Sequence, residues 1–174
     1  FKNEPYKRYK VVVDGSFQVP PNERMDSFEI DFICTEVYAE AIASTATVKT
    51  WDVNMWSWIS GISWDDTLTY TFTEKNFTVN NLGTAPINPL ESQMRITVNG
   101  NFPNGFTLRN VTTNETYKFN GALTNTDVLT IDRIDTYVNG INRFSATNRK
   151  LLTLTNGLNV FEIIEDGLLS ISFD

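Results

Sequence analysis

The sequence predicts an all-β protein built around an antiparallel β-sandwich. Short runs of alternating apolar and polar residues recur along most of the chain, as is typical of strands with one buried face. From residue 99 onward these runs are separated by Asn-Gly or Asp-Gly pairs, which favour tight hairpin turns because both residues tolerate positive φ. Several short strands without a long helical pattern between them indicate an antiparallel sandwich.

Two strands are predicted near the N-terminus. The run from Tyr9 to Val19 alternates apolar and polar side chains, and Pro20-Pro21 ends it because proline cannot donate to a β-ladder. A second alternating run extends from Phe28 to Cys34, and we expect these two strands to pair. The stretch from Glu36 to Thr50 lacks a clear apolar stripe, so we predict irregular structure there.

The rest of the chain carries the other predicted strands. Residues 80 to 89 indicate a boundary or a turn with extended flanks, because proline restricts its neighbours. The predicted strands are Leu68 to Phe72, Phe77 to Val79, Met94 to Val98, Phe106 to Leu108, Tyr117 to Phe119, Val128 to Ile131, Leu151 to Leu154, Val160 to Ile163 and Leu168 to Phe173. The predicted turns are Asn99-Gly100, Asn104-Gly105, Asn120-Gly121, Asn139-Gly140, Asn156-Gly157 and Asp166-Gly167.

Length, charge and cysteine content restrict the ligands and the cellular compartment that we expect for this protein. The chain has 174 residues and a formal net charge of -7, which argues against nucleic acid as a ligand because phosphate binding depends on Lys and Arg. The single cysteine, Cys34, cannot form an internal disulfide, and it shares a strand face with Phe28 and Phe32, so we expect it to be buried. No apolar run reaches the roughly 18 residues of a membrane span. We expect a protein folded in a reducing cytosol, and a piece of a longer chain, since it opens on Phe1 rather than Met.

Residue types also restrict the possible chemistry. The sequence has no histidine, which excludes Ser-His-Asp and Cys-His nucleophilic sites and His-based metal sites. A glycosidase would need two carboxyls roughly 5 to 10 Å apart across a cleft. The candidate pairs are Asp65 with Asp66, Asp132 with Asp135, and Glu165 with Asp166. Neighbouring residues of a strand point to opposite faces, so Asp65 and Asp66 would not face one cleft, and Glu165-Asp166 precedes the turn residue Gly167. We therefore predict no enzyme and no catalytic residue. We also predict no metal and no cofactor.

All four tryptophans of the chain lie within one short segment, as Trp51, Trp56, Trp58 and Trp64. Three interpretations stay open. The indoles pack in a core between two parts of the chain, or they anchor a subunit or neighbour interface, where aromatic residues are enriched. Alternatively, an exposed indole stacks on a sugar ring.

Several segments carry a family resemblance because they occur together and in order. They are Lys7 to Tyr9, Phe28 to Phe32, Val37 to Glu40, Asn54 to Trp58, Tyr70 to Phe72, Phe77 to Thr84, Asn110 to Asn114, Asp127 to Asp132, Asn139-Gly140 and Leu152 to Asn159. This arrangement resembles the siphophage distal tail protein family, whose members form the hub at the tip of long non-contractile phage tails.

The resemblance implies a ring-forming N-terminal domain and a C-terminal β-sandwich of galectin-like or jelly-roll type. Residues 1–46 would be the last strands of the ring domain, 47–66 a Trp-rich linker and 67–174 the sandwich. It implies a structural hub in the virion tail tip that links the tail tube to tail-tip, lysin and receptor-binding proteins, with no specific nucleic acid and no membrane as partners. The full-length protein would be a hexamer, and a monomer stays open for this piece.

A carbohydrate-binding module that contributes to host-surface adhesion is the alternative, because galectin-like sandwiches often bind sugars on one face. The predicted sandwich contains no tryptophan. The available aromatic platforms are therefore Tyr70, Phe106, Tyr117 and Tyr137.

Overall fold

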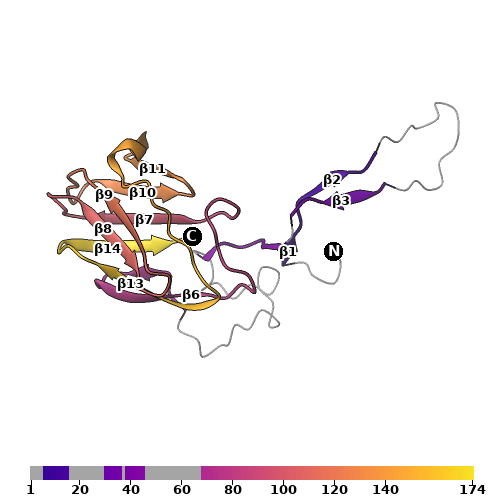
Figure 1. The fold of residues 1–174 in the computed structure, drawn as a ribbon, viewed down its shortest axis with the longest axis horizontal. Helices are drawn as coiled ribbons and strands as arrows, with labels where there is room; N and C mark the ends of the chain where they lie inside the picture. The colour runs from indigo at the N-terminus through magenta and orange to yellow at the C-terminus, as the bar shows by residue number, and fades with distance from the viewer. Residues whose placement is uncertain (1–5, 16–29, 37, 46–67) are drawn as a thin grey trace, which may run out of the picture. The chain divides into compact units, whose positions relative to one another are not determined.

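The computed structural model describes residues 6–15, 30–36, 38–45 and 68–174. These residues fall into two compact units, one containing the residues up to Ala43 and the other those from Ser44 on (Figure 1). The predicted linker 47–66 and its four tryptophans lie outside the described residues, so the domain boundaries stay a prediction.

The first unit consists of two short antiparallel ribbons. Strand β1 (Lys7–Arg8) pairs with β4 (Glu40–Ala41), which corrects the prediction of irregular structure at those two residues. Strand β2 (Val11–Val13) pairs with β3 (Phe32–Cys34). The predicted pairing of the two N-terminal runs is therefore confirmed.

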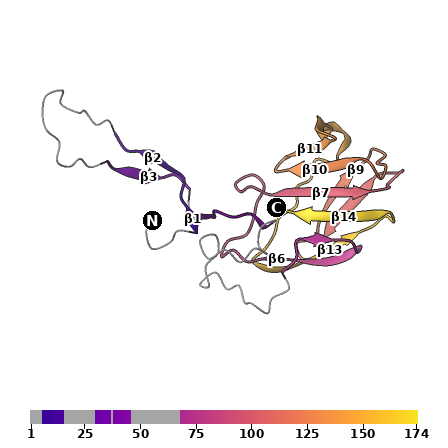
Figure 2. The same ribbon diagram turned by 180° about the vertical axis from the view of Figure 1, so that it is seen from behind.

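The second unit is an antiparallel sandwich, as predicted. Its strands are β5 (Thr71–Phe72), β6 (Asn76–Asn81), β7 (Arg95–Gly100), β8 (Phe106–Asn110), β9 (Glu115–Phe119), β10 (Val128–Asp132), β11 (Asp135–Val138), β12 (Ile141–Asn142), β13 (Gly157–Ile163) and β14 (Leu168–Phe173). A six-stranded sheet has the order β12-β11-β10-β7-β14-β5, and a four-stranded sheet has the order β6-β13-β8-β9. Figure 2 shows β11, β10, β7 and β14 side by side. The part of the chain that the structure describes contains no α-helix, and the 3-10 turn η3 (Phe144–Ala146) follows β12.

The core lies between the inner faces of the two sheets. The six-stranded sheet contributes Ile96, Val98, Leu129, Ile131, Ile171 and Phe173, and the four-stranded sheet contributes Phe77, Val79, Phe106, Leu108, Phe161 and Ile163. Phe161 is fully buried, with its ring centroid 5.6 Å from that of Phe77 and 5.1 Å from that of Phe173. Strand alternation thus sends one apolar face of each sheet inward.

The segment from Leu151 to Leu154 is not a strand, contrary to the prediction. Leu154 forms a single bridge with Ile87, and Leu152 and Leu154 are buried. Buried amide side chains hold the adjacent backbone. Asn110 Nδ2 donates to the Thr153 carbonyl at 2.8 Å, and Asn159 Oδ1 accepts from Thr155 N at 2.9 Å. Tertiary hydrogen bonds therefore replace a β-ladder in this segment.

The Asn-Gly signals have different outcomes. Asn139 and Gly140 both have positive φ, of 51° and 79°, and close the β11–β12 hairpin as predicted. The prediction of a turn at Asn99-Gly100 is wrong, because both residues lie inside β7. A Cβ on Gly100 would lie 2.6 Å from the Gly167 carbonyl oxygen, so close packing requires this glycine. Gly167 has a φ of 114° and connects β13 and β14, which belong to different sheets.

Two hairpins form at positions that carry no Asn-Gly pair. The β8–β9 turn contains Asn114, with φ 57°, and the β10–β11 turn contains Arg133, with φ 54°. Strand β11 was not predicted, since its polar Asp135 and Thr136 hide the apolar alternation. Thr136 is nonetheless buried, and its hydroxyl lies 2.9 Å from that of Tyr117 on the opposite sheet.

Candidate functional site

The carboxylates of Asp132 and Asp135 belong to a polar network on the sheet surface. The two residues are opposite each other in β10 and β11. Arg95 Nη2 donates to Asp132 Oδ2 at 2.7 Å, and this hydrogen bond and charge raise the pKa of Arg95. Asn142 Nδ2 donates to Asp135 Oδ1 at 3.3 Å. Each carboxylate therefore has a partner that fixes its position.

Glu165 accepts hydrogen bonds from a neighbouring residue, whereas Asp166 forms an ion pair at the surface. Thr107 donates to both Glu165 oxygens, through its N–H and its hydroxyl, at 2.7 Å each. Asp166 forms an exposed ion pair with Lys75 at 2.9 Å. Asp65 and Asp66 lie outside the described residues. Within the described ranges, no group of three or more Cys, Asp or Glu residues is arranged to hold a metal ion, and no helix could span a bilayer.

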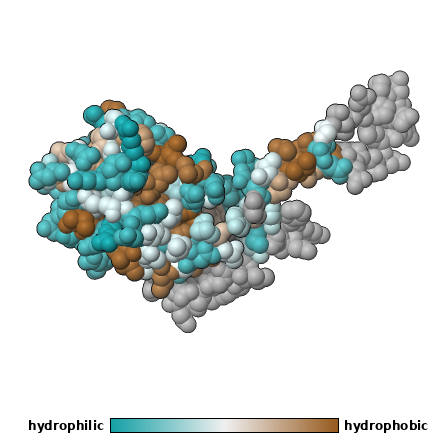
Figure 3. All heavy atoms as spheres, viewed as in Figure 1, coloured by the Kyte–Doolittle hydropathy of each residue, from teal (hydrophilic) through white to brown (hydrophobic). Residues whose placement is uncertain are grey.

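The β2–β3 pair forms a first candidate surface, which we call the apolar ribbon. It consists of Val11, Val12, Val13, Phe32 and Ile33, whose exposed fractions range from 44% to 58%. The register places Val12 and Ile33 on one face and Val13 and Phe32 on the other. Figure 3 shows hydrophobic colour over this ribbon. Apolar side chains therefore reach solvent from both faces.

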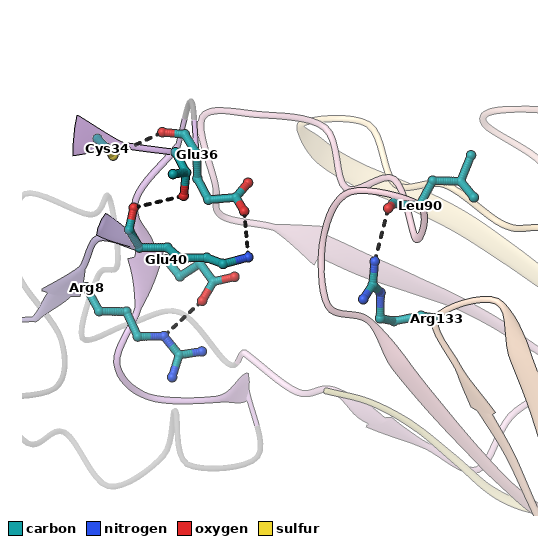
Figure 4. Close-up of polar contacts among 8 residues, drawn as sticks. Arg8, Cys34, Glu36, Glu40, Leu90 and Arg133 are labelled. Atoms are coloured by element: carbon teal, nitrogen blue, oxygen red, sulfur yellow. Dashed lines mark hydrogen bonds and ion pairs between the residues drawn. The ribbon is translucent and has the colours of Figure 1, made fainter. Parts of the chain in front are cut away.

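Cys34 also lies on this ribbon and is exposed, so the prediction that it is buried is wrong. Its thiol lies 3.2 Å from the Glu36 carbonyl oxygen (Figure 4). Nearby, Arg8 Nε forms an exposed ion pair with Glu40 at 2.9 Å, shown in the same view. The apolar alternation that predicted burial is present, but no second layer covers it among the described residues of this unit.

The outer face of the six-stranded sheet forms a second candidate surface. Its centre is a row of hydroxyl-bearing side chains, one from each of five adjacent strands, which we call the hydroxyl row. The row consists of Tyr137, Thr130, Thr97, Ser172 and Thr71. Thr97 lies between Ile96 and Val98, which are fully buried, so its side chain points outward.

Three of the four aromatic platforms considered for sugar binding lie in the core. Phe106 is fully buried, and Tyr70 and Tyr117 are nearly so. The Tyr70 hydroxyl donates to the Asn80 carbonyl at 2.8 Å, and burial raises the pKa of Tyr117 to about 12. No sugar can stack on a ring in these positions. Tyr137 differs because it is partly exposed and belongs to the hydroxyl row.

The hydroxyl row was missed because its members come from distant parts of the sequence. Four members, Thr71, Thr97, Thr130 and Ser172, are polar residues of alternating runs that are visible in the sequence, whereas Tyr137 lies in β11, whose alternation is hidden. Their alignment depends on strand order and register, which alternation does not specify.

Comparison with known proteins adds no family assignment. No protein-family model matches the chain, and no curated protein matches it in sequence. Proposals about function therefore depend on the two surfaces described above and on the ordered motifs of the sequence.

Proposed function

We propose that this protein is a structural component of a siphophage distal tail, in which it forms the hub between the tail tube and the tail-tip, lysin and receptor-binding proteins. It would be located in the virion tail tip and would perform no chemistry. The ordered motifs from Phe28 to Asn159 support this proposal. The structural observation that carries it is the apolar ribbon.

A two-stranded hairpin is at best marginally stable in water, because it cannot bury a face by itself. The ribbon exposes apolar side chains on both faces, and contiguous exposed apolar surface marks interaction sites. In a closed ring, each subunit lies between two neighbours. A ribbon at the subunit boundary can therefore be covered on both faces by other copies of the chain.

Charge is compatible with the same role. The formal net charge of -7 disfavours binding of DNA phosphates, and a ring through which a genome passes must not retain DNA. A hexamer with an acidic channel would satisfy this requirement.

The test is the solution mass of this chain and of the full-length protein, measured by light scattering over a range of concentrations. We expect the full-length protein to associate to six copies and to form rings with a central channel in electron micrographs. The double variant Val12→Thr, Ile33→Thr should return the chain to a monomer, because threonine keeps β-propensity but removes apolar surface.

Leu158→Thr is the matched control, since Leu158 is an exposed aliphatic residue on the sandwich. It should leave the mass unchanged. A full-length protein that stays monomeric at all concentrations, or an assembly that survives the double ribbon variant, would contradict the proposal.

A further inference from the structure

We propose that the outer face of the six-stranded sheet binds a neutral, extended glycan, which lies across the strands along the hydroxyl row. This inference goes beyond the structural hub and does not depend on it. It assigns the sandwich a ligand of its own, on a surface remote in sequence from the apolar ribbon.

The row is continuous across the sheet. Thr130 is opposite both Tyr137 and Thr97, and Ser172 is opposite both Thr97 and Thr71. Adjacent strands lie about 4.8 Å apart, which is comparable to the length of one hexose ring in an extended glycan. Figure 2 labels four of the five strands of this row, β11, β10, β7 and β14. Successive hydroxyls can therefore meet successive sugar residues.

The hydroxyls at the centre of the row are available to a ligand. Within the described part of the chain, the side-chain hydroxyls of Thr97, Thr130 and Ser172 have no hydrogen-bond partner. The residues beside them, Ile96 and Ile171 among them, are fully buried and fix the backbone. The hydroxyls are thus held on a rigid support, which lowers the entropy cost of binding.

The ends and flanks of the row supply the other contacts that sugars use. Tyr137 offers a partly exposed ring for stacking against the apolar face of a pyranose. Asn142 is opposite Tyr137 and extends the row to the sixth strand. The Arg95–Asp132 ion pair lies on the same face and provides both donors and acceptors.

Composition favours a glycan over other ligands. The core of a protein–protein interface is depleted in charge and rich in apolar contacts, whereas the row contains no aliphatic side chain. Val128, two residues from Thr130 on the row's own face, is 37% exposed, whereas Leu158 and Val160 on the other outer face are 65% and 44% exposed. A net charge of -7 disfavours acidic polymers, so the glycan should be neutral.

The probe is a panel of neutral hexasaccharides of β-linked glucose, mannose, galactose and N-acetylglucosamine, titrated by calorimetry and followed by NMR. We expect at least one to bind and to shift the amide signals of residues in the row. Thr97→Val and Tyr137→Ala should each weaken that binding about tenfold, as expected for the loss of one hydrogen bond or one stacked ring.

Thr116→Val is the matched control, because Thr116 is exposed on the four-stranded sheet. Ser172→Ala is a second row variant if Thr97→Val lowers the thermal midpoint. The proposal is overturned if no hexasaccharide binds, if the row variants bind as the parent does, or if the shifted signals lie elsewhere. The ribbon variant Val12→Thr, Ile33→Thr should keep glycan binding, which separates this test from that of the hub.

Discussion

The two units of the chain contain the same kind of strand but bury it differently. In β7, Ile96 and Val98 have 0% exposure, because the four-stranded sheet covers them. In β2, Val11 and Val13 are 44% and 49% exposed. Apolar residues and pairing therefore suffice to form a strand, but burial requires a second layer. The sandwich contains that layer, and the apolar ribbon does not have one in its own described unit.

The largest contrast is expected between two phenylalanines. Phe161→Ala should lower the free energy of unfolding by about 3–5 kcal/mol, because it removes a fully buried ring and leaves a cavity. Phe32→Ala should change it by less than about 0.5 kcal/mol, since Phe32 is exposed. Denaturant unfolding followed by circular dichroism measures both. Equal losses would show that the ribbon is buried in the free chain.

The same contrast between buried and exposed groups should hold for polar side chains, with a smaller loss in the free energy of unfolding. Asn110 is fully buried; it donates to Thr153 O and accepts from Thr112 N at 3.0 Å. Asn110→Ala should destabilise the sandwich by about 1–3 kcal/mol, because buried backbone groups lose their partners. The Arg8–Glu40 pair is more than half exposed, and Glu40→Gln should cost less than about 1 kcal/mol. Thermal unfolding of both variants measures the difference in stability. An equal change in their midpoints would contradict the expectation that the buried asparagine contributes more than the exposed ion pair.

The smallest expected effect concerns pH. Hydrogen bonds from the Thr124 hydroxyl and backbone N–H, and from Asn139, lower the pKa of Asp127 below its ordinary value of 3.8. A lowered folded-state pKa stabilises the protein above pH 3.8, and this contribution is lost as the pH falls through the folded-state pKa. Asp127→Asn should therefore flatten the decline of stability in acid.

An NMR titration of the Asp127 side chain tests the cause directly. Thr124→Val removes the hydroxyl that donates at 2.6 Å, so the pKa of Asp127 should move up toward 3.8. An unchanged pKa in Thr124→Val would contradict the assignment of the shift to this hydrogen bond. Because Asp127 lies at the surface, the effect on global stability should stay small.

The amino-acid sequence alone determined the all-β class and most of the sandwich strands. Alternation predicted β7, β9, β10, β13 and β14, because a strand with one buried face must repeat every second residue. It also predicted the Asn139-Gly140 hairpin, where both residues take the positive φ that the turn requires. These are local properties, and local chemistry is sufficient to specify them.

Only the tertiary structure decided the sheet order, the buried faces and the two candidate surfaces. Gly100 looks like a turn residue but lies in a strand, because its backbone packs against Gly167. Tyr117 and Tyr137 each follow a threonine in a short strand, yet one is in the core and the other on the outer face. The difference arises because pairing between distant strands selects which face a second sheet covers, and no short segment contains that information.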